Sequence, residues 1–285
     1  MELDFPVEQT VRSRYSVRTY EERPLSLGEK EKINAYIAAL KNSPSPFSAD
    51  VTLRLLEAKA GTGTEKLGTY GVIKGAGNFI GAAVPNGELA MEALGYTFEK
   101  LILYVTHLGL GTCWLGGTFK RSEFASAMSL KENELFPAVS PVGYPAAKKR
   151  LIENFARKIA KSDQRKAWNE LFFKNGFTTP LDKSDAGEYA FPLEMLRLAP
   201  SASNKQPWKV LKSGGTFHFY EVKTPGYGDK APYDIQKADV GIAFCHFHMA
   251  ALEKDLSGKF EKLPEPDITS PDHTHYLFSW VSTQE

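Results

Sequence analysis

Two long apolar segments, one in each half of the 285-residue chain, limit the possible folds more than any other feature. The first covers residues 89–108, begins after the turn signal Pro85-Asn86-Gly87, and ends at Gly109 and Gly111. The second covers residues 238–256. Segments this long and this apolar predict buried helices, around which the rest of each half must pack.

A short sequence pattern occurs in both predicted helices. Leu94-Gly95-Tyr96-Thr97-Phe98 and Val240-Gly241-Ile242-Ala243-Phe244 share an apolar-Gly-apolar-small-Phe pattern at an offset of 146 residues. A match this short can arise by chance, or it can record a duplication. Under duplication, the chain consists of two related α+β halves, each with a long central helix, and the two central helices pack together.

Shorter elements surround these helices and make the expected fold class α+β. Ser26 and Glu29 have capping-box spacing, which predicts a helix from there to about Lys41. The basic run 148–166 is typical of a solvated helix that joins two units, so we place the halves at 1–150 and 151–285, interlocked with each other. Strands are predicted at 51–58, 78–84, 138–144, 208–211 and 217–221, and further helices at 122–128 and 192–198.

The charge and cysteine content narrow the class of function. Thirty-five basic and thirty-four acidic side chains leave a formal net charge of +1, so no global field attracts nucleic acid or an anionic membrane. Cys113 and Cys245 are the only cysteines, which argues against a disulfide framework or a zinc site and favours a reducing, cytoplasmic setting. We expect neither a signal peptide nor a membrane span, because no apolar run is long enough.

The first candidate site is the segment Arg14-Tyr15-Ser16-Val17-Arg18. Arg14 and Arg18 share a face whether the segment is helical or extended, because both periods bring residues four apart together. Ser16 joins that face only if the backbone is extended. Two guanidiniums and a hydroxyl then suit a phosphate dianion. The alternative is an ordinary solvated basic patch.

A second candidate follows the first long helix, in the run Gly109-Leu110-Gly111-Thr112-Cys113-Trp114-Leu115-Gly116-Gly117. Glycine lets a backbone N–H approach a flat ligand, because it has no Cβ. A dinucleotide-binding fingerprint is excluded, since it needs a strand before the glycines and a helix after them. A Schellman-type helix stop is the alternative, and it explains Gly109 or Gly111 more easily than Gly116 and Gly117.

A third candidate is a polar loop between Pro200 and Pro207, which joins a predicted helix to a predicted strand. Its amide and hydroxyl groups can bind the edge of a polar heterocycle, whereas an ordinary turn needs only one or two such residues. The polar members are Ser201, Ser203, Asn204 and Gln206, and Trp208 begins the strand.

Together these segments resemble the nitroreductase family of FMN-dependent oxidoreductases. That family has an Arg-x-Ser-x-Arg/Lys phosphate motif, matched by Arg14, Ser16 and Arg18, and a Pro-Ser-x-x-Asn-x-Gln-Pro-Trp loop, matched by residues 200–208. It also has a Gly-Leu-Gly-x-x-Trp-x-Gly segment, matched by residues 109–116. A Gly-Tyr-Pro strand end with basic residues after it is matched by residues 143–145 with Lys148 and Arg150.

The resemblance implies a nitroreductase-like fold and assigns roles to these residues. It implies that NADH or NADPH is the reductant and that the acceptor is a small oxidised molecule such as a nitroaromatic or a quinone. No side chain need act as a nucleophile, so no catalytic residue is assigned. The phosphate would be held by Arg14, Ser16, Arg18, Lys148 and Arg150, the ribityl chain and ring edge by Pro200, Ser201, Asn204 and Gln206, and the N5 side by Leu115, Gly116 and Gly117.

The order of the motifs departs from that of an ordinary member, in which the polar loop follows the first helix. Here that place holds Asn42-Ser43-Pro44-Ser45-Pro46-Phe47, which lacks the Asn-x-Gln core. Arg165-Lys166-Ala167-Trp168 stands where a second phosphate motif belongs, and Ser257-Gly258 where a second glycine segment belongs. The chain therefore resembles the tandem nitroreductase-like proteins, in which one chain mimics the homodimer. We expect one complete site, one FMN per chain and a monomer.

Another class of function competes with this interpretation. The loss of one of two sites indicates a relaxed constraint, which favours a non-enzymatic FMN- or nucleotide-binding protein used in sensing, storage or control of a partner. Metal chemistry is poorly supported, because His246 and His248 lie two apart in a predicted helix and point to different faces. The sequence contains neither a Gly-x-Ser-x-Gly elbow nor a P-loop.

Overall fold

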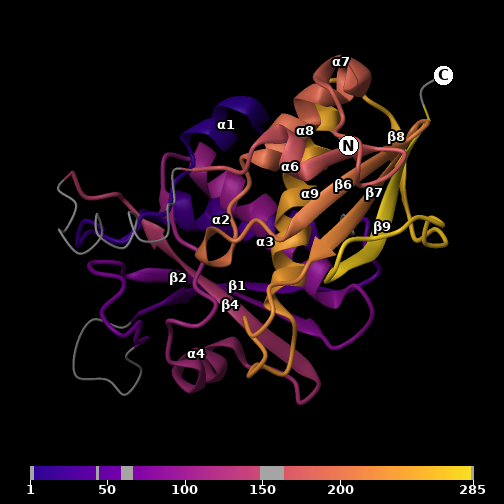
Figure 1. Ribbon diagram of the computed structural model, residues 1–285. Coiled ribbons are helices and arrows are strands. Elements are labelled where there is room, and N and C mark those ends of the chain that lie inside the picture. The colour runs from indigo at the N-terminus through magenta and orange to yellow at the C-terminus, as the bar shows by residue number, and fades with distance from the viewer. Residues whose placement is uncertain (1–2, 43–44, 59–66, 148–163, 284–285) are drawn as a thin grey trace. The chain divides into compact units, whose positions relative to one another are not determined.

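The computed structural model describes residues 3–42, 45–58, 67–147 and 164–283 (Figure 1). The chain divides into two compact units: the first consists of Ser13–Lys161, and the second of Met1–Arg12 together with Ser162–Glu285. The N-terminal residues thus belong to the unit that is otherwise built from the C-terminal half. The predicted boundary between residues 150 and 151 lies outside the described residues and stays a prediction.

The first unit contains a four-stranded antiparallel sheet in the order β1-β2-β4-β3. The predicted capping box is confirmed at the start of its first helix, where Glu29 Oε2 accepts from Ser26 N at 2.8 Å and Glu29 N donates to Ser26 Oγ at 3.3 Å. The strands are β1 (Thr52–Glu57), β2 (Asn78–Pro85), β3 (Gly111–Thr112) and β4 (Glu134–Gly143), and the helices are α2 (Leu27–Asn42), α3 (Ala90–His107) and α4 (Arg121–Met128).

The second unit contains a five-stranded sheet in the order β5-β6-β7-β9-β8, in which β5 is parallel to β6 and the other described pairs are antiparallel. The strands are β5 (Phe172–Lys174), β6 (Trp208–Ser213), β7 (Thr216–Val222), β8 (Gly258–Glu261) and β9 (Thr274–Ser282). The helices are α1 (Val7–Ser13), α6 (Trp168–Leu171), α7 (Lys183–Ala186), α8 (Ala190–Arg197) and α9 (Ile235–Glu253), with 3-10 turns at Gly187–Tyr189 and Ala202–Asn204.

The start of helix α1 is hydrogen-bonded to the carboxylate of Glu253, which is distant in sequence. The backbone N–H groups of Val7 and Glu8 donate to the two carboxylate oxygens of Glu253, at 2.5 and 3.1 Å. The first N–H groups of a helix have no partner within the helix, and a negative charge there also interacts favourably with the helix dipole. Glu253, the last residue of α9, therefore stabilises the start of α1.

The same topology occurs twice in the chain. Apart from the short strand β5 of the second unit, two strands precede the long helix and two follow it in each unit, and the sheet order β1-β2-β4-β3 corresponds strand for strand to β6-β7-β9-β8. The corresponding pairs are antiparallel in both units, and the inner pair has a register shift in both. The repeated pentapeptides lie in α3 and α9, where Phe98 and Phe244 are fully buried. This correspondence favours duplication over a chance match, and the mixed α+β class is confirmed.

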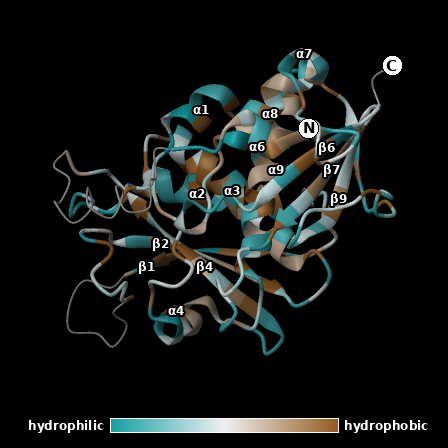
Figure 2. Cartoon of the chain, in the orientation of Figure 1, coloured by the Kyte–Doolittle hydropathy of each residue, from teal (hydrophilic) through white to brown (hydrophobic). Residues whose placement is uncertain are grey.

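Apolar burial and aromatic packing stabilise each unit. Strands β2 and β4 are buried along almost their whole length, and Figure 2 shows the brown hydrophobic colour on them. In the first unit, Phe124 packs edge-to-face against Phe79 and Phe119, with ring centroids 5.1 and 5.4 Å apart. In the second unit, Phe244 packs against Phe219 and Phe278 at 5.1 and 5.0 Å. Within the described ranges, no helix is both long and apolar enough to cross a membrane.

Candidate functional site

The segment that contains Arg14, Ser16 and Arg18 is extended and lies beside β3 in the first unit. Ser16 forms an isolated parallel bridge to Thr112, and Val17 N donates to Thr112 O at 2.8 Å. Because side chains alternate along an extended backbone, Arg14, Ser16 and Arg18 project to one side and Val17 to the other. The extended backbone thus meets the condition under which Ser16 joins the two arginines.

The strand end Gly143-Tyr144-Pro145 belongs to the same backbone network. Tyr144 O accepts a hydrogen bond from the chain that follows the arginine segment, at 2.9 Å, and Ala146 N donates to Thr19 O at 3.0 Å. Three of the four predicted motif segments therefore come together within the first unit. Lys148 and Arg150, the basic residues predicted to follow this strand, lie outside the described residues.

Gly109 and Gly111 have structural explanations. Gly109 has a φ of +80° and ends α3 in a Schellman motif, in which its N–H donates to Thr106 O at 2.9 Å and the next N–H donates to Val105 O at 3.2 Å. A Cβ at Gly111 would lie 2.8 Å from Val17 Cγ2, so glycine is needed where the arginine segment packs on β3. The helix-stop interpretation therefore accounts for Gly109, and close packing accounts for Gly111.

Leu115, Gly116 and Gly117 differ in what they offer a ligand. Leu115 exchanges two backbone hydrogen bonds with Val139, at 2.9 and 3.0 Å, and its side chain belongs to the buried core. Gly116 O accepts from Arg121 Nη2 at 3.2 Å. Gly117 has open space where a Cβ would be. Close approach of a flat ligand is therefore possible at Gly117, whereas Leu115 is committed to the core.

Arg14 carries the strongest sign of an anion site. Its side chain is 6% exposed, and its Nε and Nη1 atoms are buried without a hydrogen-bond partner among the described residues. Glu99 lies at the edge of ion-pair range, with Oε1 4.0 Å from Arg14 Nε, while its Oε2 accepts from Trp114 Nε1 at 2.6 Å. Unused donors on a buried guanidinium are costly unless an acceptor reaches them. Phosphate oxygens suit this guanidinium, because they accept strong, charge-assisted hydrogen bonds.

The polar loop at residues 200–207 lies in the second unit and has a constrained backbone. Ser201 Oγ accepts from Gln206 N at 2.8 Å, and Ala202 N donates to Asp239 Oδ1 at 3.0 Å. Three residues of the loop have a left-handed backbone, with φ between 49° and 54°: Ser203, Asn204 and Gln206. This conformation is uncommon for residues other than glycine and costs conformational energy, so the surrounding contacts must hold it in place.

The amides of Asn204 and Gln206 bind residues 164–166 of the same unit. Asn204 Nδ2 donates to Gln164 O at 3.0 Å, and its Oδ1 accepts from Arg165 Nη1 at 3.2 Å. Gln206 Oε1 accepts from Lys166 N at 2.8 Å, across a separation of 40 residues. An amide group can take part in up to four hydrogen bonds, so these contacts do not exclude a ligand. Sequence reasoning missed them, because only the fold brings the two segments together.

Buried carboxyl groups adjoin this loop. Asp239 is 3% exposed, its Oδ2 has no hydrogen-bond partner in the described part of the chain, and burial raises its pKa well above the ordinary value. Glu221 is 2% exposed, and burial together with the nearby Asp234 carboxylate raises its pKa to about 7. In the sequence, the only indication of this buried carboxyl group is that Asp239 lies near the start of an apolar helix. Among the described residues, no group of His, Cys or acidic side chains could hold a metal ion.

The raised pKa of Glu221 predicts that the second unit loses stability as the pH rises. Folding favours the neutral carboxyl, so its stabilisation is complete below the ordinary pKa of 4.5 and is lost as the pH rises to about 7. Glu221→Gln stays neutral, so its stability relative to the parent should rise by up to about 3 kcal/mol between about pH 5 and about pH 8.

Urea unfolding of both proteins at the two pH values measures this difference. Glu188→Gln is the matched control, because Glu188 is an exposed acid of the same unit and should show no such change. An identical pH response of Glu221→Gln and the parent would show that Glu221 does not keep its proton in the fold.

Comparison with known proteins bears on the whole chain. A family model described as "Putative TM nitroreductase" matches residues 6–251. The fold is similar to that of a protein from Thermotoga maritima MSB8 described as a "putative nitroreductase", with a TM-score of 0.60 and 18% sequence identity, covering 99% of this chain and 95% of that chain. The predicted nitroreductase-like α+β fold is therefore confirmed.

Other solved structures match about half of the chain. The match to a nitroreductase family protein from Clostridium novyi NT has 18% sequence identity and a TM-score of 0.38, and it covers 52% of this chain and 92% of that chain. A protein from Desulfovibrio desulfuricans, described as a "putative nitroreductase in complex with fmn", is 23% identical, with a TM-score of 0.37, and covers 53% and 96%. No curated protein matches the sequence.

Proposed function

The chain belongs to the nitroreductase-like family described as "Putative TM nitroreductase", and we propose that it is an FMN-dependent oxidoreductase of nitroreductase type. Arg14 carries the proposal, because its buried Nε and Nη1 atoms lack hydrogen-bond acceptors among the described residues and suit an oxyanion. Its segment packs on the glycine run at Gly111, so an anion at Arg14 lies in the same unit as the glycines. The four motifs that resemble those of nitroreductases support the FMN phosphate as that anion.

Each group of motif residues has a proposed role in holding FMN. When bound, FMN would supply the redox chemistry, with NADH or NADPH as the hydride donor and a small oxidised molecule, such as a nitroaromatic or a quinone, as the acceptor. The protein contributes orientation and electrostatics. In this proposal Arg14, Ser16, Arg18, Lys148 and Arg150 would hold the phosphate, and Gly116 and Gly117 would lie on the N5 side, whereas Leu115, also predicted there, is committed to the core. Pro200, Ser201, Asn204 and Gln206 would contact the ribityl chain and the ring edge.

A single chain would then replace the homodimer of ordinary members. The arginine segment and the glycine run belong to the first unit, and the polar loop belongs to the second. The repeated sheet topology supports this proposal, because four strands of the second unit follow the same order as the four strands of the first. We propose one FMN per chain, a monomer and a cytoplasmic location.

The absorption spectrum of the purified protein tests the proposal. After reconstitution with FMN, we expect the bands of oxidised flavin, a flavin-to-protein ratio of one, and bleaching of the bands on anaerobic addition of NADH or NADPH. Bands that neither nicotinamide bleaches would instead favour a non-enzymatic FMN-binding protein. A ratio of two would contradict the single site, and a protein that binds no FMN would overturn the proposal.

A further inference from the structure

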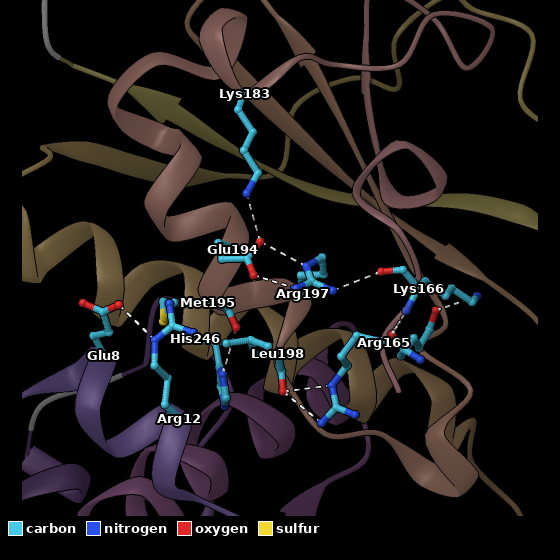
Figure 3. Close-up of polar contacts among 11 residues, drawn as sticks. Glu8, Arg12, Arg165, Lys166, Lys183, Glu194, Met195, Arg197, Leu198 and His246 are labelled. Atoms are coloured by element: carbon cyan, nitrogen blue, oxygen red, sulfur yellow. Dashed lines mark hydrogen bonds and ion pairs between the residues drawn. The ribbon is translucent and has the colours of Figure 1, made fainter. Parts of the chain in front are cut away.

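Arg165 lies at the position where a second phosphate motif is expected, but its guanidinium binds the protein's own backbone. Its Nε and Nη2 atoms donate to Leu198 O at 3.2 and 3.1 Å (Figure 3). Leu198 follows the last residue of α8, and the final carbonyl groups of a helix have no partner within the helix. An arginine at this position satisfies one of them and interacts favourably with the helix dipole.

The same guanidinium also reaches the polar loop. Arg165 Nη1 donates to Asn204 Oδ1 at 3.2 Å, and Asn204 has a positive φ of 54°. A planar guanidinium presents its donors in a fixed fork, so it holds both acceptors in a defined relative position. Arg165 therefore ties the loop to the end of α8.

Lys166 extends the connection to the other amide of the loop. Its backbone N–H donates to Gln206 Oε1 at 2.8 Å, and its Nζ donates to Gln206 O at 3.1 Å. Its carbonyl oxygen accepts from Arg197 Nη1 at 3.3 Å, and Arg197 is fixed by an ion pair to Glu194 at 2.6 Å (Figure 3). Burial lowers the pKa of Lys166, in keeping with a lysine that lies against the loop rather than in solvent.

These contacts meet a need of the loop itself. Its residues with positive φ adopt a conformation that relaxes unless surrounding structure holds it. Contacts from residues 164–166 fix the two amides, while Ser201 Oγ and Asp239 fix the backbone N–H groups of Gln206 and Ala202. The loop therefore depends for its shape on residues 164–166 and on Asp239, which lie outside it in the sequence.

We propose that Arg165 is a positioning residue for the polar loop at residues 200–207, so that a residue at the place of the lost phosphate motif now supports the remaining FMN site. Arg165 shapes the loop through Asn204 and does not bind phosphate. This inference rests on the proposed function, because it concerns the same FMN site.

FMN titration followed by flavin fluorescence, at about 50 mM and about 500 mM salt, tests the inference. We expect Arg165→Ala to weaken FMN binding roughly tenfold, and by the same factor at both salt concentrations, because no phosphate contact is lost. Arg165→Lys keeps the charge but loses the fork, so we expect it to be weakened as well. Lys259→Ala, a change at an exposed cation of the same unit, is the control and should bind FMN as the parent does.

The outcomes separate this inference from the proposed function. Parent affinity in Arg165→Ala, or full affinity in Arg165→Lys, would overturn the positioning role. A loss in Arg165→Ala that disappears at high salt would show a phosphate contact and would also overturn it. If Arg165→Ala does not fold, the milder Arg165→Lys carries the test. A parent protein that binds no FMN would overturn the proposed function instead.

Discussion

Replacing Arg14 with alanine is expected to weaken FMN binding by about 100-fold or more at low salt. Two charge-assisted hydrogen bonds from Nε and Nη1 would be lost, each worth roughly 1.5–3 kcal/mol, and about 1.4 kcal/mol corresponds to a factor of ten. Salt screens charge interactions, so the difference from the parent should shrink as the salt concentration rises. Titration with FMN at two salt concentrations measures both effects.

Two further variants make this experiment specific to the anion site. Arg12→Ala is the control, because Arg12 is half exposed and forms a local ion pair with Glu8 on α1, at 2.9 Å. Arg14→Ala also leaves the Glu99 carboxylate buried without its neighbouring cation, so Arg14→Ala should be repeated in a Glu99→Gln background. Parent-like FMN affinity of Arg14→Ala at both salt concentrations would remove the phosphate assignment.

Replacing Phe244 with alanine is expected to lower the free energy of unfolding of the second unit by about 3–5 kcal/mol. Phe244 is fully buried in α9, and its ring packs against Phe219 and Phe278 at 5.1 and 5.0 Å. Alanine would leave a cavity that this close-packed aromatic cluster cannot fill without moving several rings. Denaturant unfolding followed by tryptophan fluorescence and circular dichroism measures the loss.

The duplicated topology gives this experiment a matched counterpart. Phe98 holds the same place in the first pentapeptide, is fully buried in α3, and lies 4.5 Å from the Trp114 ring. Phe98→Ala should therefore destabilise the first unit by a similar amount. Leu27→Ala is the control, because Leu27 is 73% exposed and its loss should change stability by less than about 0.5 kcal/mol. A loss of that small size in Phe244→Ala would contradict the described packing.

The long helices could be predicted because a repeated local pattern specifies them. Helices α2 and α3 begin close to the residues that capping and turn signals predict, and Gly109 marks the end of α3. Elements α6 and α7 have only four residues each and β3 only two, which is too short for a periodic signal. Strand β9 was missed although its run of aromatic and apolar residues at 276–281 is typical of a buried strand.

Some residues of the candidate site could likewise be predicted from the sequence, and others could not. The arginine segment and the polar loop stand out by residue type, and Ser16 needed only the extended backbone that the structure provides. The roles of Arg165 and Asp239 depend on contacts across 39 and 37 residues, which no local pattern encodes. A lone arginine and a lone aspartate become informative only once the fold shows what they hold.

The hydrogen bonds between α1 and Glu253 have a consequence for the order of folding. Val7 lies 246 residues before the carboxylate that binds it, so α1 leaves the ribosome long before its partner does. Contacts this distant in sequence form late, because a long loop must close before they contribute. The first unit is a single contiguous segment and can fold during synthesis, whereas the second unit cannot be completed until the residues that follow the first unit have emerged.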